Sequence, residues 1–213
     1  MKVRVSFERI RQTLIVVLLV TAMIRSGVQA QTTLALGPKV GASFSGFRGE
    51  DAGNISFRKG VVGGLFVAIS PVPFFTIQPE LLLQQKGAVN ENDNFNFKED
   101  VKLGYLNFPV LLKLRLPLAD NSLFPHIYAG PQFSYKLKSE YAVSSLDTVN
   151  VFRDLDLRSY DLGGVFGFGL DVELNHLFIT ADFRYALGAV NLSDESLLKN
   201  KDISIMAGIG YKF

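Results

Sequence analysis

Three features of the sequence carry side chains that could do chemistry: a glycine-rich stretch, two histidines and a set of charged residues. The glycine-rich stretch, GGVFGFG at 163–169, has the composition of a nucleotide-binding loop. Such a loop joins a strand to a helix. Here the glycines lie inside one alternating segment, so the stretch predicts no cofactor site.

The two histidines, His126 and His176, do not form a metal site with the residues around them. Neither belongs to an H-x-x-x-H pair, and the chain has no cysteine, so a zinc site lacks ligands. His126 with an acid and a serine could form an acyl-transfer site. Because both histidines fall at the starts of predicted strands, a polar role in packing is the simpler interpretation. We therefore predict no catalytic, cofactor-binding or metal-binding residue.

The elements that position these side chains are strands, because apolar residues recur with a period of two and no stretch shows helical periodicity. Long and short connections alternate between the segments, as they do in outer-membrane barrels. The segments cover residues 35–47, 58–70, 75–87, 101–117, 124–138, 158–174, 177–190 and 202–213.

This pattern predicts an all-β fold, an eight-stranded antiparallel up-and-down transmembrane β-barrel formed by residues 31–213. An even number of strands places both termini in the periplasm. Alternation alone would also suit a soluble barrel. Small residues on the polar face favour the membrane arrangement, since a narrow interior must fit large charged groups beside small ones. These residues are Gly163, Gly167, Gly169, Gly208 and Gly210.

The charged residues on the polar faces predict a network that fills the lumen, because eight strands leave room only for side chains and buried charges must be paired. We expect Glu80 to face Lys113, and we place Lys136 and Lys138 inward as well. The predicted lumen charge network consists of Glu80, Lys113, Arg115, Asp171, Asp182 and Arg184.

Aromatic residues cluster next to the short connections and at the C-terminus, which predicts an aromatic girdle at the inner membrane interface. They are Phe74, Phe75, Phe124, Phe178, Tyr211 and Phe213. The last two end an alternating strand and resemble the signal that the outer-membrane barrel assembly machinery reads.

The N-terminus has the three-part pattern of a secretory signal peptide. A basic segment, 1–12, precedes twelve uncharged residues, 13–24, which are too few to span a membrane as a helix. Small residues follow, and we predict cleavage after Ala30. The signal contains five of the 22 basic residues and one of the 20 acidic residues, so the mature chain has a net charge of −2. It offers no basic surplus for nucleic acid.

Several stretches resemble the Bacteroidetes-type outer-membrane β-barrel family, also called PorT-family proteins. They are GPKVGASFSGF (37–47), GGLFVAISPVPFFTIQPELLLQQKGA (63–88), LGYLNFPVLLKLRLP (103–117), YAGPQF (128–133) and GIGYKF (208–213). The resemblance covers nearly the whole mature chain and implies an eight-stranded barrel in the outer membrane, with no assigned chemistry and no cofactor.

The sequence therefore predicts a non-enzymatic outer-membrane protein with a charge-plugged lumen. Its partners would be outer-membrane lipid, the barrel assembly machinery and an unidentified extracellular or envelope protein that contacts its outer loops. Two alternatives remain open: a secreted, soluble, lipocalin-like carrier of small ligands, and an outer-membrane lipid-modifying enzyme.

Overall fold

The computed structural model describes residues 32–49, 56–92, 97–118, 122–145, 148–153, 158–191 and 198–213. The predicted signal peptide, residues 1–30, lies outside this part of the chain. In the described ranges no helix is long and apolar enough to cross a membrane. The strands are β1 (Thr33–Arg48), β2 (Ser56–Val72), β3 (Phe75–Asn92), β4 (Phe97–Arg115), β5 (Leu123–Ser145), β6 (Thr148–Arg153), β7 (Tyr160–Leu174), β8 (Leu177–Gly188) and β9 (Lys199–Lys212).

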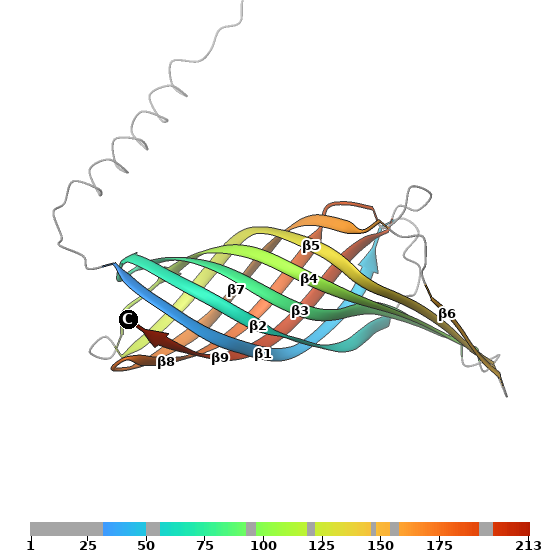
Figure 1. Ribbon diagram of the computed structural model, residues 1–213, viewed down its shortest axis with the longest axis horizontal. Coiled ribbons are helices and arrows are strands. Elements are labelled where there is room, and N and C mark those ends of the chain that lie inside the picture. The colour runs from blue at the N-terminus through green and yellow to red at the C-terminus, as the bar shows by residue number, and fades with distance from the viewer. Residues whose placement is uncertain are drawn as a thin grey trace, which may run out of the picture. The chain divides into compact units, whose positions relative to one another are not determined.

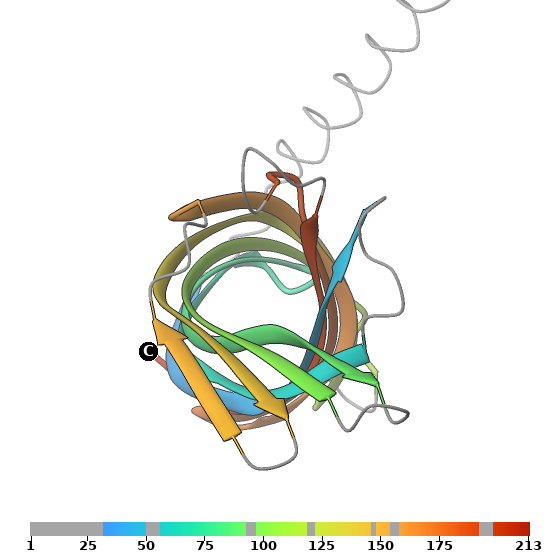
Figure 2. The same ribbon diagram turned by 90° about the vertical axis from the view of Figure 1, so that its right-hand side faces the viewer.

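Eight of these strands form a closed antiparallel barrel, as Figures 1 and 2 show. Going around the ring, the order is β1, β2, β3, β4, β5, β7, β8 and β9, and β9 pairs with β1 to close it. When β6 is left out, each strand therefore pairs with the strands before and after it in the chain. The predicted eight-stranded up-and-down barrel is confirmed.

The additional strand, β6, lies outside the ring and within the segment 139–157, which we had predicted to be a connection. It pairs only with the far end of β5, from Glu140 to Ser145, whereas the first half of β5 pairs with β7. Val149 and Val151 give β6 a period-two pattern, but the strand is only six residues long. Such a short segment between polar residues carries little alternation signal. In Figure 1 the β5–β6 hairpin reaches beyond the ring of strands.

The faces of the strands are polar inside and apolar outside. In β8, Thr180, Asp182 and Arg184 are between 1% and 3% exposed, whereas the alternate residues Ile179 and Phe183 are 45% and 36% exposed. A soluble carrier would have the reverse distribution, with an apolar lumen and a polar outer face. The soluble lipocalin-like alternative is therefore wrong.

Glycines on the inner face make the large polar side chains possible. A Cβ added at Gly169 would lie 2.3 Å from the Ala181 carbonyl oxygen and 2.6 Å from His126 Nε2. A Cβ added at Gly210 would lie 2.2 Å from Cε1 of Phe178. The absence of these side chains gives His126 and Phe178 their space in the lumen.

One end of the barrel carries the tight turns and the C-terminus (Figure 1). The turn between β7 and β8 consists of Asn175 and His176, and Asn175 adopts a left-handed φ of 53°, which asparagine tolerates better than most residues. The chain then ends beside this turn, because Lys212 N donates to the His176 carbonyl (2.6 Å) and Phe213 N donates to the Leu34 carbonyl (2.9 Å). We call this the turn end and the opposite one the loop end.

The predicted aromatic girdle is wrong at two of its residues. Phe124 and Phe178 are only 4% and 6% exposed, so they point into the lumen and are not part of an aromatic girdle. Both occupy inward positions of their own strands, and nearness to a turn does not override that alternation.

Lys138 is exposed, although we predicted it to point inward. Tyr105 pairs with Lys136 and the adjacent Gly104 pairs with Lys138, so Leu137 is an extra residue in β5. A bulge of this kind shifts the alternation by one residue, which brings Lys138 to the outer face and Ser139 into the interior.

Candidate functional site

The candidate site is a set of charged side chains in the lumen that come from seven of the eight barrel strands. The structure places all six residues of the predicted lumen charge network in the interior, each at most 8% exposed. Three further titratable residues contact them, Lys39, His126 and Glu173, and Lys212 in turn contacts Glu173. We call these ten residues the ion-paired half of the lumen.

Glu80 and Lys39 lie at the centre of this half. Lys39 Nζ is 3.0 Å from Glu80 Oε1 and also pairs with Asp182 Oδ2. Arg184 Nη2 is 2.8 Å from Glu80 Oε2. Since β3 and β8 lie four strands apart in either direction around the ring, the Glu80–Arg184 pair connects opposite walls of the barrel.

Glu80 does not pair with Lys113, which corrects the prediction from the sequence. The register between β3 and β4 sets Lys113 opposite Thr76, four residues before Glu80. Gln78 lies between the two charges instead: its amide donates to Glu80 Oε1 (2.6 Å), and its carbonyl oxygen accepts from Lys113 Nζ (3.2 Å). A shift of four residues keeps every inward residue inward, so the alternation could not reveal the true register.

His126 joins the centre of the network to its turn-end part. Its Nε2 is 2.9 Å from Asp182 Oδ1, and its Nδ1 is 3.4 Å from Asp171 Oδ1. The imidazole is 3% exposed. Both ring nitrogens thus face carboxylates, and neither has a hydroxyl nucleophile beside it among these contacts.

The network continues to the turn end through Arg115. Arg115 Nε is 3.2 Å from Asp171 Oδ2, and its Nη2 is 2.5 Å from Glu173 Oε1. Lys212 Nζ completes the series at 2.7 Å from Glu173 Oε2. The guanidinium of Arg115 also lies 4.2 Å from the centre of the Phe124 ring, a cation–π contact that explains the inward position of this phenylalanine.

The charges in this half are close to balance, with five cations and four carboxylates beside His126. Isolated charges are costly to bury, and pairing with additional hydrogen bonds offsets much of that cost. The arrangement therefore fills the lumen with charged side chains, and the cost of burying each charge is offset by its oppositely charged partners.

The part of the lumen nearer the loop end is different, because amides dominate its contacts. Gln84 donates to Asp202 Oδ2 (2.8 Å) and accepts from the Asn107 amide (2.6 Å). Asn200 donates to Asp161 Oδ2 (2.9 Å). We call these five residues the amide half. We did not predict it, although the inward position of each residue was readable from the alternation.

Among the described residues no group of three or more His, Cys, Asp or Glu side chains could hold a metal ion.

The comparisons with known proteins agree with this architecture. A family model described as "Outer membrane protein beta-barrel domain" matches residues 29–191. The chain belongs to this family. It is therefore an outer-membrane β-barrel protein, and its exposed apolar side chains form the surface that faces lipid.

A solved structure shows the same fold for this outer-membrane barrel. The outer membrane protein OprG from Pseudomonas aeruginosa superimposes with a TM-score of 0.53 at 14% identity, over 85% of this chain and 96% of OprG. Neisserial surface protein A gives a TM-score of 0.49 at 11% identity, over 85% of this chain and 97% of that protein. No functionally curated protein matches the chain.

Proposed function

We propose that this protein is a non-enzymatic outer-membrane barrel whose lumen is closed by ion pairs, and that it acts through its extracellular loops or as a structural component of the envelope. The resemblance of its sequence supports placing it among the Bacteroidetes-type, PorT-family barrels. The observation that carries the proposal is the Glu80–Arg184 pair between opposite walls, with Lys39 and Asp182 beside it. Side chains that meet across the full width leave little room for a solute path.

The proposal predicts that the purified protein forms no large pore. Planar bilayers containing the refolded, heat-modifiable barrel should show no stable conductance steps of the size of a general porin, which has about 16–18 strands. Steps of that size from pure protein would contradict a closed lumen.

The surroundings of His126 support the absence of enzymatic activity. A catalytic histidine needs one ring nitrogen next to the nucleophile or the reacting atom, and here both nitrogens face carboxylates. We expect that the refolded protein releases no fatty acid from radiolabelled phospholipid. Release that disappears in a His126→Ala variant would favour the lipid-modifying alternative.

The proposed orientation has the turn end and both termini in the periplasm. Short turns at one end support it, because outer-membrane barrels have short periplasmic turns and longer extracellular loops. A cysteine introduced at Ser122, next to a short turn, should remain unlabelled by an impermeant maleimide on intact cells. A cysteine introduced at Asn150 in β6 should be labelled.

We further propose that Tyr211 and Phe213 form the signal for the barrel assembly machinery. Their side chains are 48% and 73% exposed on the lipid-facing side of the last strand, and their rings contact each other edge to face at 5.2 Å. Phe213→Asp should therefore block assembly, measured as loss of heat-modifiable protein in the membrane. Phe213→Tyr is the control and should assemble normally. Assembly of Phe213→Asp at the wild-type level would contradict the proposed signal.

A further inference from the structure

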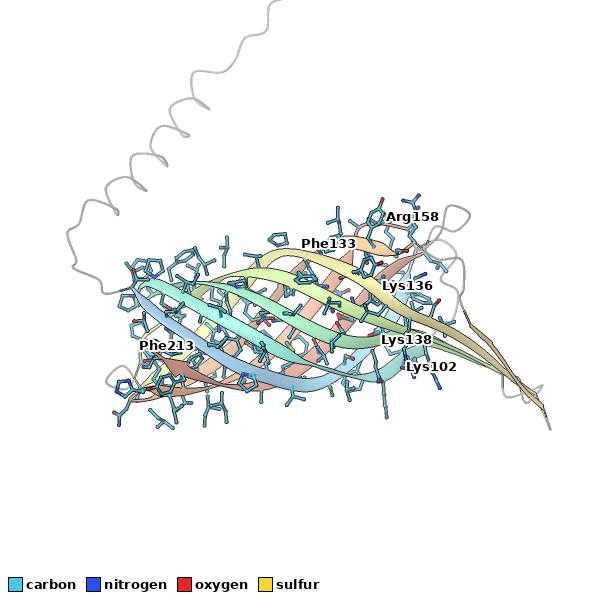
Figure 3. The ribbon with its side chains drawn as sticks, in the orientation of Figure 1. Lys102, Phe133, Lys136, Lys138, Arg158 and Phe213 are labelled. Carbon is cyan, nitrogen blue, oxygen red and sulfur yellow. The ribbon has the colours of Figure 1, made fainter. Side chains whose placement is uncertain are left out.

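The hairpin of β5 and β6 carries an unpaired sheet edge outside the ring of strands. Each of the eight ring strands has a neighbour on both sides, whereas β6 is the last strand in the sheet order and pairs only with β5. Figure 3 shows the hairpin leaving the ring near Lys138, at the end opposite Phe213. Among the strands that the structure describes, β6 is therefore the one whose free edge runs along its whole length.

The sequence of β6 favours a strand and does little to protect its edge. The strand reads TVNVFR, and threonine, valine and phenylalanine are typical strand residues. Natural edge strands are commonly blocked by lysine, by proline or by a bulge. β6 contains neither lysine nor proline, and its only charged residue, Arg153, is the last one. Its edge is short but open to a further strand.

The direction of the peptide groups in β5 follows from the bulge at Leu137. Before the bulge, Lys136 N donates to the Ser159 carbonyl, on the β7 side of β5. The extra residue shifts the alternation by one, so Ser139 takes over this direction, and it is buried as Ser134 is before the bulge. The pairing of β5 with β4 shows no further shift beyond this point. Odd-numbered residues of β5 therefore direct their peptide groups toward β6.

Two valines of β6 consequently direct their peptide groups away from β5. In an antiparallel pair, residues that exchange hydrogen bonds alternate with residues whose peptide groups point outward. Asn150 lies opposite the odd-numbered Val143, whereas Val149 and Val151 lie opposite Ser144 and Ala142. The N–H and C=O groups of Val149 and Val151 thus form the outer edge of the sheet.

The occupant that fits such an edge is an extended polypeptide, because a row of main-chain donors and acceptors matches another main chain. A second copy in the same membrane does not fit well. Two such copies would be related by a twofold axis along the barrel, which makes their β6 strands run the same way. All strand pairings in this protein are antiparallel, and parallel pairing is slightly less stable.

We propose that β6 is a docking edge for an extended, proline-free segment of another protein, which adds to the sheet as a further antiparallel strand. The location of this edge outside the cell rests on the proposed function, which places the loop end there. Main-chain hydrogen bonds supply the affinity in this mode of binding, and alternate side chains supply the specificity.

The first test measures the binding of a fluorescent peptide, SEYAVSS, to the refolded barrel in detergent by fluorescence anisotropy. The peptide repeats residues 139–145, and Glu140 to Ser145 already pair antiparallel with β6 in the chain. Val151→Pro should weaken binding about 5-fold, and Val149→Pro with Val151→Pro roughly 25-fold, because each proline removes one outward donor. An edge strand tolerates proline where its N–H faces solvent.

Val151→Thr is the matched control, because it keeps both the N–H group and the branched side chain, and it should bind like wild type. The same peptide with every amide N-methylated should not bind. Equal affinity of the double proline variant and wild type would overturn the proposal, as would equal affinity for the methylated peptide. A dimer of the barrel that the double proline variant abolishes would identify a second copy as the occupant, and would also overturn it.

Amide hydrogen exchange tests the pairing residue by residue. In the free protein the amides of Val149 and Val151 should exchange faster than the amide of Asn150, which faces β5. Adding the peptide should slow the exchange of the two valines and leave Asn150 nearly unchanged. Unchanged exchange at both valines would show that the peptide does not extend the sheet, and would contradict the proposal.

Heat modifiability confirms in each variant that the barrel has formed. Binding in detergent does not depend on orientation, so a failed binding test leaves the proposed function intact. Failure of the maleimide to label the Asn150 cysteine on intact cells would instead contradict the proposed orientation and, with it, the location of the edge outside the cell.

Discussion

The two halves of the lumen are built from different chemistry, although both are lined by inward residues of the same strands. The ion-paired half joins opposite walls through full charges, as in Glu80 and Arg184. The amide half uses hydrogen bonds of neutral groups to two carboxylates, as in Gln84 and Asp202. Removing one member of a buried ion pair costs much more stability than removing one hydrogen bond between an amide and its acceptor. Substitutions in the ion-paired half should therefore lower the free energy of unfolding more than substitutions in the amide half.

The largest difference is expected between two aspartates that occupy the two halves. Asp182→Asn removes a carboxylate that contacts Lys39 and His126, and breaking such a buried pair costs about 3–5 kcal/mol. Asp202→Asn keeps an oxygen that can accept from Gln84, so we expect a cost of about 1 kcal/mol. Urea unfolding of the refolded barrel in detergent measures both. Equal losses would mean that the two halves do not differ in the proposed way.

The second prediction concerns the space around the ion-paired half. Gly169→Ala would bring a Cβ to 2.6 Å from His126 Nε2 and 2.3 Å from a backbone oxygen, and overpacking of this kind costs about 1–3 kcal/mol. Gly164 is in the same strand, and its added Cβ would meet nothing within 4 Å. Gly164→Ala is therefore the control and should leave the unfolding midpoint nearly unchanged. A harmless Gly169→Ala would show that the lumen has spare volume.

The smallest effect is expected where the ion-paired half reaches the turn end. Glu173 and Lys212 are each 19% exposed in their side chains, and Glu173 also keeps Arg115 as a partner. Solvent screens such a pair, so Lys212→Ala should cost about 1 kcal/mol or less in the same unfolding assay. Lys212→Arg should retain the pair. A loss as large as that of Asp182→Asn would mean that the network is as strongly coupled at the turn end as at its centre.

The fold and the inward charges could be predicted from the sequence because both follow from alternation with a period of two. Asp182 and Arg184 point inward in the structure because every second residue of β8 does. The partners of these charges could not be predicted. Glu80 has Lys39 and Arg184 instead of Lys113, because the register between strands can shift by an even number of residues without changing either face.

The bulge at Leu137 is the second feature that could not be predicted from the sequence. One extra residue turned Lys138 outward and Ser139 inward, and nothing in the local composition marks it. It moved Lys138 from the predicted interior to the outer face, so a single irregularity changed which surface a charge belongs to. The strand β6 was missed for a related reason, since it lies outside the ring whose pattern guided the prediction.

The most direct test of the closed, ion-paired lumen is a double-mutant cycle between Glu80 and Arg184. Glu80→Ala, Arg184→Ala and the double variant are unfolded by urea in the same detergent, and the free energies of unfolding are compared. Glu80→Ala leaves Arg184 without the carboxylate that it pairs with, whereas Arg184→Ala leaves Glu80 with Lys39 as its remaining cation. Breaking a buried pair from one side costs about 3–5 kcal/mol. We predict that the double variant loses clearly less than the two single losses added together. Strictly additive losses would mean that the two side chains do not meet across the lumen, and would contradict the account.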